Sequence, residues 1–150
     1  MVQADGISIA EARSILGHAL EALICGDLRA IDLFVEDVEG DSPNMCVRTR
    51  DELANQMLDR VGAFSNVEFA IDRLERVDQE FVASWHMSGV HTGAVLLNED
   101  EFFEASGLPI ELSATTHVAF RGRRIAAFRT AYDGSDPFEL LRRRPTTGPP

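Results

Sequence analysis

Apolar residues follow a helical period in the first third of the chain and an alternating period in much of the rest. The stripe that predicts a first helix, over residues 9–25, consists of Ala12, Ile15, Leu16, Ala19, Leu20 and Leu23. Shorter apolar sets predict a short second helix carrying Leu28, Ile31 and Leu33, and a third helix over residues 51–61. Residues 35–45 are interrupted by glycine and proline, so we expect an irregular arm between these two helices.

Helix starts are marked where a capping oxygen precedes a carboxylate by three residues. The pairs with this spacing are Ser8 with Glu11, Thr49 with Glu52, and Asp136 with Glu139. Pro137 stands at the first position of the last predicted helix, where its missing N–H costs nothing.

Beyond Ser65, apolar and polar residues alternate along the chain, and this pattern predicts strands. A first strand contains Val67, Phe69, Ile71 and Leu74, and a second alternates Phe81, Ala83, Trp85 and Met87 with polar residues. Residues 110–120 and 124–133 predict a closing hairpin whose turn contains Gly122. Between these strands, residues 98–107 predict an acidic loop. This loop is either a solvated surface or a lid that places Phe102 and Phe103 over the mouth of a pocket.

Helices followed by strands predict an α+β fold rather than a parallel βαβ fold. We expect a cone-shaped, curved antiparallel sheet of about four long strands plus the short arm, covered by three N-terminal helices around one apolar pocket. The chain of 150 residues fits one domain, predicted over residues 1–141, with a frayed tail at residues 142–150.

Charge and composition exclude several classes of function. The net charge of −11 argues against a nucleic-acid partner, and the absence of lysine excludes Schiff-base chemistry. No apolar stretch approaches membrane-spanning length, and the first residues do not resemble a signal peptide, so we expect a cytoplasmic protein without a membrane partner. Neither the two cysteines nor His86, His91 and His117 have metal-ligand spacing, so we expect no metal and no cofactor.

A resemblance to a known family is carried by short segments in a shared order. These segments are Gly26-Asp27-Leu28, residues 33–37, residues 49–53, Trp85 with residues 89–93, and residues 122–125 through Tyr132-Asp133. From residue 9 to residue 141 their order resembles the SnoaL-like branch of the nuclear-transport-factor-2-like superfamily. The resemblance implies the cone-shaped fold and a homodimer through the outer sheet face. It leaves the activity open, because members include polyketide cyclases, limonene-type epoxide hydrolases, ketosteroid isomerases and binding proteins.

The polyketide cyclases of this family use an aspartate five residues after the isoleucine that begins the last strand. Here that position is Thr130, counted from Ile125, and a hydroxyl cannot replace a titratable carboxylate. Other polar positions match better: His117 stands where the cyclases have a strand histidine, Thr115 where they have glutamine, and Asn55 where the third helix offers an amide.

The other two enzyme classes match less well. Epoxide hydrolases need an Asp–Arg–Asp arrangement, whereas Arg129 and Asp133 flank Thr130 and the central strand reads Trp85-His86-Met87. Ketosteroid isomerases need a tyrosine on the first helix and an aspartate before a proline. The sequence has Ala19 and Ser42 at these places, with Asp41 one residue early.

Candidate site residues have ordinary structural interpretations beside their functional ones. His117 is either a pocket histidine that donates a hydrogen bond or acts as a base, or a core-edge residue. His86 either pairs with His117 across the sheet or faces the dimer interface. Asp133 is either a general base or a strand-end carboxylate, and it lies on the opposite strand face from Thr130. Trp85, Phe128 and Tyr132 are expected as wall or core residues.

The leading hypothesis is a domain that binds a small apolar or polycyclic ligand. Its predicted contacts are Trp85, Phe128 and Tyr132 as walls, with His86, His117, Thr115, Thr130 and Asn55 as polar groups. The alternatives are a cyclase-like or isomerase-like enzyme using His117 with Asp133 or Asp41, and a dimeric protein-interaction module.

Overall fold

The computed structural model describes residues 6–98, 101–134, 139 and 141, without the side chains of residues 97 and 98. Its helical elements are α1 (Ile9–Cys25), the 3-10 helix η1 (Leu28–Leu33) and α2 (Arg50–Leu58). Its strands are β1 (Phe34–Ser42), β2 (Met45–Val47), β3 (Phe64–Val77), β4 (Glu80–His91), β5 (Val95–Asn98), β6 (Glu101–Phe103), β7 (Pro109–Arg121) and β8 (Arg124–Tyr132). The chain therefore has an α+β fold, as the sequence predicts.

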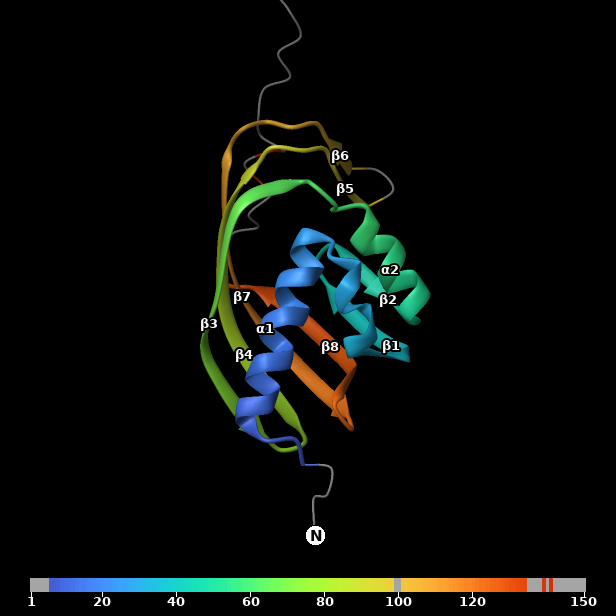
Figure 1. Ribbon diagram of the computed structural model, residues 1–150. Helices are drawn as coiled ribbons and strands as arrows, with labels where there is room; N and C mark the ends of the chain where they lie inside the picture. The colour runs from blue at the N-terminus through green and yellow to red at the C-terminus, as the bar shows by residue number, and fades with distance from the viewer. Residues whose placement is uncertain (1–5, 99–100, 135–138, 140, 142–150) are drawn as a thin grey trace, which may run out of the picture.

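Six strands form one curved, mostly antiparallel sheet in the order β2-β1-β8-β7-β4-β3 (Figure 1). The pairing of β1 with β8 is parallel, and every other pairing in this sheet is antiparallel. The expected count of about four long strands plus a short arm is wrong, because β1 is itself a nine-residue strand inside the sheet. A separate two-stranded sheet consists of β5 and β6.

The residues that we predicted to form an irregular arm are strand residues because Gly40 lies under an aromatic ring. A Cβ atom at Gly40 would overlap the ring of Phe128 on the neighbouring strand. Glycine therefore allows β1 to approach β8 closely, and only Pro43 and Asn44 interrupt the strands, in the turn between β1 and β2.

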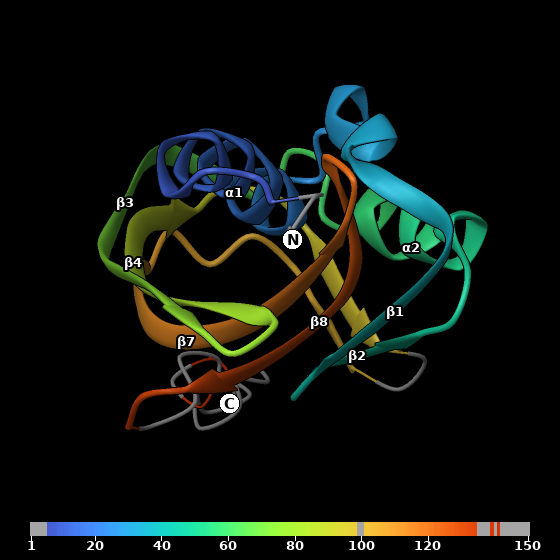
Figure 2. The same ribbon diagram turned by 90° about the horizontal axis from the view of Figure 1, so that it is seen from below.

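The sheet curls around the helices, which lie on its concave side (Figure 2). Register shifts in β3, next to Ser65 and Ile71, contribute to this curvature because bulges bend a strand and increase its twist. The helix α1 packs alanines and leucines inward: Ala12, Leu16, Ala19, Leu20 and Ala22. The small side chains of the three alanines allow the helix to lie close to the sheet.

Both predicted caps within the described residues are present. Ser8 and Glu11 form a reciprocal capping box at the start of α1, and the Thr49 side chain accepts from the Glu52 N–H at the start of α2. The cap predicted at Asp136, and the tail over residues 142–150, lie outside the described residues. No described helix is long and apolar enough to cross a membrane.

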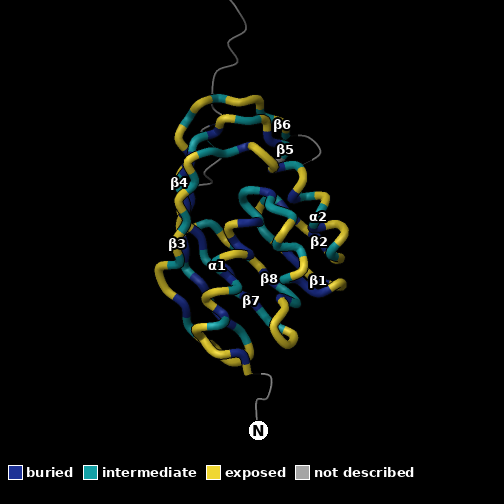
Figure 3. Tube along the Cα trace, in the orientation of Figure 1, coloured by how far each residue is buried: buried dark blue, intermediate teal, exposed yellow. Residues whose placement is uncertain are grey.

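Buried residues, which are dark blue along the chain trace in Figure 3, form two hydrophobic clusters. The larger cluster joins α1 to the six-stranded sheet, and the smaller one contains Ala63, Val95, Ile110 and Leu141. Phe103 packs against the smaller cluster, whereas Phe102 is 59% exposed. The hypothesis of a lid made by both phenylalanines is therefore wrong for Phe102, and part of the predicted acidic loop is the strand β6.

Candidate ligand-binding cavity

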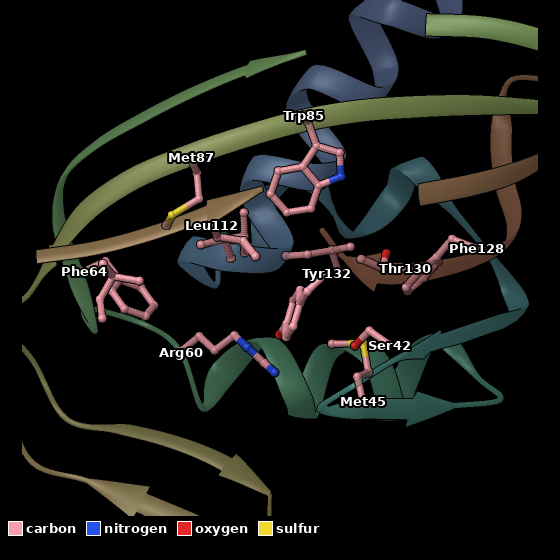
Figure 4. A pocket seen from close by; sticks show the side chains of 13 residues that line it. Ser42, Met45, Arg60, Phe64, Trp85, Met87, Leu112, Phe128, Thr130 and Tyr132 are labelled. Carbon is pink, nitrogen blue, oxygen red and sulfur yellow. The ribbon is translucent and has the colours of Figure 1, made fainter. Parts of the chain in front are cut away.

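A cavity of about 630 Å³, including its open mouth, lies between the concave face of the sheet and the ends of α1 and α2 (Figure 4). Seven elements and the turn after α2 contribute its lining because the curved sheet converges on the helix ends. The lining residues are Leu23, Ile24, Ser42, Met45, Arg60, Phe64, Trp85, Met87, Ile110, Leu112, Phe128, Thr130 and Tyr132. Most of these side chains are aliphatic or aromatic, so the cavity suits an apolar molecule.

Trp85 is held in the wall by contacts on two sides. Its ring packs against Phe69 with centroids 5.4 Å apart. Its indole Nε1 donates to Thr116 Oγ1 at 2.9 Å, so the buried polar atom is satisfied. Phe128 is fixed in a similar way by an edge contact with Phe34, with centroids 6.0 Å apart. Two aromatic side chains are therefore positioned before any ligand arrives.

A chain of hydroxyl groups connects Trp85 to the cavity surface. Thr116 is fully buried, and its hydroxyl lies 2.8 Å from that of Thr130, which lines the cavity. Thr116 accepts from Trp85, and either threonine hydroxyl can be the donor in the bond between them. The Thr130 hydroxyl can therefore take part in a hydrogen bond with a ligand as donor or as acceptor.

Arg60 is the charged residue among the lining residues. It is only 8% exposed, and its Nη1 donates to the Gln56 carbonyl at 2.8 Å. Burial lowers the pKa of the Arg60 guanidinium, an effect that nearby Tyr132 and Asp59 oppose. Arginine nevertheless stays protonated in proteins, so the cavity contains a positive charge.

Tyr132 lies beside the Arg60 side chain at the same end of the cavity (Figure 4). Its hydroxyl accepts a hydrogen bond of 3.0 Å from Asn44 Nδ2. Since Asn44 lies in the turn between β1 and β2, this bond ties that turn to the end of β8. The polar groups of the cavity are thus gathered from β1, β8 and the turn after α2.

The structure divides the predicted ligand contacts between two faces of the sheet. Trp85, Phe128, Thr130 and Tyr132 line the cavity. Thr115 and His117 do not, because Thr116 between them points inward and successive strand residues point to opposite faces. Their prediction as groups that orient a ligand inside this cavity is therefore wrong.

His86 and Asn55 also lie away from the cavity lining. His86 is exposed on β4, where its Nδ1 lies 2.9 Å from Asp72 Oδ1, and Asn55 is exposed on α2. His86 follows the same alternation, since its neighbours Trp85 and Met87 point inward.

The three catalytic candidates lie on the outer side of the sheet. His117 Nδ1 lies 3.6 Å from Glu80 Oε1, and His117 and Asp41 line a shallow outer groove of about 370 Å³. Asp133 accepts a 3.1 Å hydrogen bond from Thr115 instead of pairing with Arg129, whose partner is Glu80. Asp133 does lie on the opposite face from Thr130, as we predicted from strand alternation.

The chemistry available inside the cavity follows from its lining. The described lining residues include no carboxylate and no imidazole. Their polar side chains are hydroxyls, which donate and accept, and one guanidinium, which only donates. Within the described part of the chain, no three His, Cys, Asp or Glu side chains are grouped in a way that could hold a metal ion.

Sequence reasoning missed several cavity residues, of which Arg60 matters most. Its position depends on how the end of α2 meets the end of α1, where a Cβ atom at Gly26 would collide with the Met57 carbonyl. In the sequence, Gly26 directly follows the predicted first helix and belongs to one of the segments that carry the family resemblance. The close contact that it allows between the two helix ends has no local sequence signal.

Comparisons with known proteins agree with this architecture. Solved structures similar to this chain include AclR from Streptomyces galilaeus, with 14% identity over 92% of this chain and 100% of that chain and a TM-score of 0.69. An epoxide hydrolase from M. tuberculosis has 18% identity over 89% of this chain and 92% of its own, with a TM-score of 0.63. A hypothetical protein with a ketosteroid isomerase-like fold from Catenulispora acidiphila, solved with trimethylamine, has 16% identity over 83% of this chain and 89% of its own, with a TM-score of 0.63.

Identities this low establish the shared fold alone. A search of curated proteins finds no significant match. The family model for the SnoaL-like polyketide cyclase, however, matches residues 15–139, which is most of the chain. The chain therefore belongs to the SnoaL-like polyketide cyclase family.

Proposed function

We propose that this protein binds a small, largely apolar ligand in the cavity between the sheet and the helix ends. The observation that carries the proposal is a partly open cavity with aromatic and aliphatic walls and a few converging polar side chains. Ligand pockets in proteins are mostly apolar with a small number of placed polar groups, as this lining is. Fixed aromatic rings at Trp85 and Phe128 favour a ligand with flat rings.

Binding fits the cavity better than proton transfer does. A general base must lie within hydrogen-bonding reach of the proton that it removes. The described lining residues supply hydroxyls, a guanidinium and apolar groups, with Thr130 at the position of the cyclase aspartate. These groups can orient a ligand and polarise a carbonyl, but none of them is a base near neutral pH.

The single tryptophan of the chain provides a direct test. Because Trp85 lines the cavity, a ligand that enters should change its fluorescence, and no other indole contributes to the signal. We expect saturable quenching or a spectral shift with at least one of three ligand classes: aromatic polyketides, steroids and terpenoids. The fluorescence of the purified protein during titration measures this.

Two variants show whether the signal comes from the cavity. Leu23→Phe adds bulk to a lining residue and should weaken binding, whereas His117→Ala on the outer face should leave it unchanged. Thermal unfolding of both variants checks that they fold. An unchanged spectrum with all three classes, or an affinity that Leu23→Phe does not alter, would contradict the proposal.

A cyclase-like or isomerase-like enzyme is the second candidate function. One observation favours it: His117 and Asp41 line the same outer groove, next to Glu80. If this groove is catalytic, His117→Ala should abolish turnover while the change in Trp85 fluorescence persists. Mass spectrometry and chromatography of each ligand recovered after incubation decide between the two, since a binder returns it unaltered.

A further inference from the structure

Arg60 is the least expected residue of the cavity. It follows α2 in a tight turn, where its N–H donates to the Met57 carbonyl at 3.0 Å and its carbonyl accepts from the Ala63 N–H at 3.1 Å. These bonds, together with the close contact at Gly26, fix the backbone from which the side chain projects. The side chain points into the cavity toward Tyr132 (Figure 4).

Among the described residues, no ion pair includes Arg60. Within this part of the chain, its guanidinium donates one hydrogen bond, to the Gln56 carbonyl. The Asp59 carboxylate lies close enough to raise the pKa of Arg60 by its charge, but it does not form an ion pair with the guanidinium. A buried charge in this state is costly, and proteins normally pair such groups.

The space in front of this charge is the ligand cavity itself. The described residues that line it bring no carboxylate to the guanidinium, and apolar side chains make up most of the rest. A ligand that enters the cavity can therefore supply a counter-ion that the described lining does not. Arginine presents N–H groups in a planar fork, and this geometry matches the two oxygens of a carboxylate.

We infer that the ligand is an apolar acid whose carboxylate binds Arg60 while its hydrocarbon rings lie against Trp85 and Phe128. This inference rests on the proposed function, since it specifies the ligand of the same cavity. It also sets the orientation, with the acidic end beside Tyr132 and the turn after α2. The remaining donor, Thr130, lies along the skeleton and can bind a carbonyl or hydroxyl there.

The test compares two probes of nearly equal shape, anthracene-2-carboxylic acid and its methyl ester. Quenching of Trp85 at neutral pH gives the affinity of each for the full-length protein. We expect the ionised acid to bind at least about tenfold more tightly than the ester, a difference of about 1.4 kcal/mol. Arg60→Met, which keeps an unbranched chain without the charge, should remove this preference and leave ester binding intact.

Arg129→Met is the matched control, because Arg129 pairs with Glu80 on the outer face of the sheet. It should keep the preference for the acid. Ester binding by Arg60→Met shows that this variant retains the cavity. If the wild type binds both probes equally, or Arg60→Met still prefers the acid, the inference is wrong while the proposed function stands. If neither probe binds the wild type, the result counts against the proposed function and this inference together.

Discussion

The family resemblance predicts that Thr130 stands at the strand position where the cyclases carry their acid–base aspartate. In this chain its hydroxyl ends the hydrogen-bonded series that begins at the Trp85 indole and passes through Thr116. The position therefore carries a hydroxyl that is linked to an aromatic wall of the cavity. At the scale of single residues, this arrangement supports the proposed binding of a ligand.

Replacing Thr130 by valine tests this link. The substitution keeps the branched shape but removes the hydroxyl that hydrogen-bonds to the fully buried Thr116 hydroxyl, which then keeps only the Trp85 indole as a side-chain partner. We expect a loss of about 1–3 kcal/mol in the free energy of unfolding. Urea denaturation measures the change, and Thr130→Ser, which retains the hydroxyl, should lose less. Equal losses in the two variants would show that the hydroxyl is unimportant.

Arg60 leads to the opposite expectation for stability. Removing a buried charge that lacks a counter-ion costs little in the ligand-free protein and often stabilises it. Arg60→Met should therefore unfold at the same temperature as the wild type or at a higher one, as differential scanning calorimetry would show. A clear drop in the midpoint would assign Arg60 a structural role.

The residues of the cavity were only partly predictable from the sequence. The place of Trp85 in the wall could be predicted because apolar and polar residues alternate regularly around it. Thr130 could be located because it is counted from the isoleucine at the start of the last strand. His117 was misplaced because its chemistry outweighed the alternation, although Ile110, Leu112, Ala114 and Val118 mark the inward face clearly. The inward position of Thr116 follows from the same pattern.

At the scale of elements, β1 and β8 meet through a glycine and an aromatic ring. The strand β1 contains Gly40 because the Phe128 ring, part of the cavity wall, occupies the space of a side chain there. From the sequence alone, Gly40 indicated a break, since glycine is uncommon inside strands. The contact partner lies on a strand far along the chain, so no local pattern could reveal it.

Gly40→Ala should therefore affect both stability and the cavity. The added methyl group forces the Phe128 ring to move, and overpacking of this kind costs about 1–3 kcal/mol. Adding Phe128→Leu should recover part of this loss, because the smaller side chain frees the space. A double-mutant cycle by urea denaturation measures the coupling. Strictly additive effects would indicate that the two residues do not interact.

At the scale of the whole molecule, the outer face of the sheet is the surface without a helical cover. It carries small and polar side chains such as Ser84, Ser113, Thr115 and Ala131, and ion pairs such as Arg129 with Glu80. Among the exposed large apolar residues of the described chain, Val77 lies on this face, opposite Glu80 at the end of β3. The others, Ile9, Leu58, Val61 and Phe102, belong to other elements or turns. A broad apolar patch, which would favour a protein-interaction module, is not evident on this face of the described structure.

The homodimer implied by the family resemblance remains a prediction for this face. If it forms there, Ala131→Arg should break it, because Ala131 is exposed beside Thr115 and an arginine would prevent close approach of two sheets. Sedimentation equilibrium should then give the mass of two chains for the wild type and of one chain for the variant. Trp85 fluorescence titrations should show that the variant still binds ligand. A monomeric wild type would contradict the expectation.

The parallel pairing of β1 with β8 has a consequence for how the chain folds. Phe34 pairs with Ile125, and Asp41 pairs with Arg129, so β1 cannot join the sheet until nearly the whole chain has been synthesised. Contacts between such distant segments slow folding, because the long intervening loop must be closed before the contacts stabilise it. Until β8 has been synthesised, β1 therefore lacks the strand with which it pairs in the large sheet. The cavity is then also incomplete, because β8 contributes Phe128, Thr130 and Tyr132 to its wall.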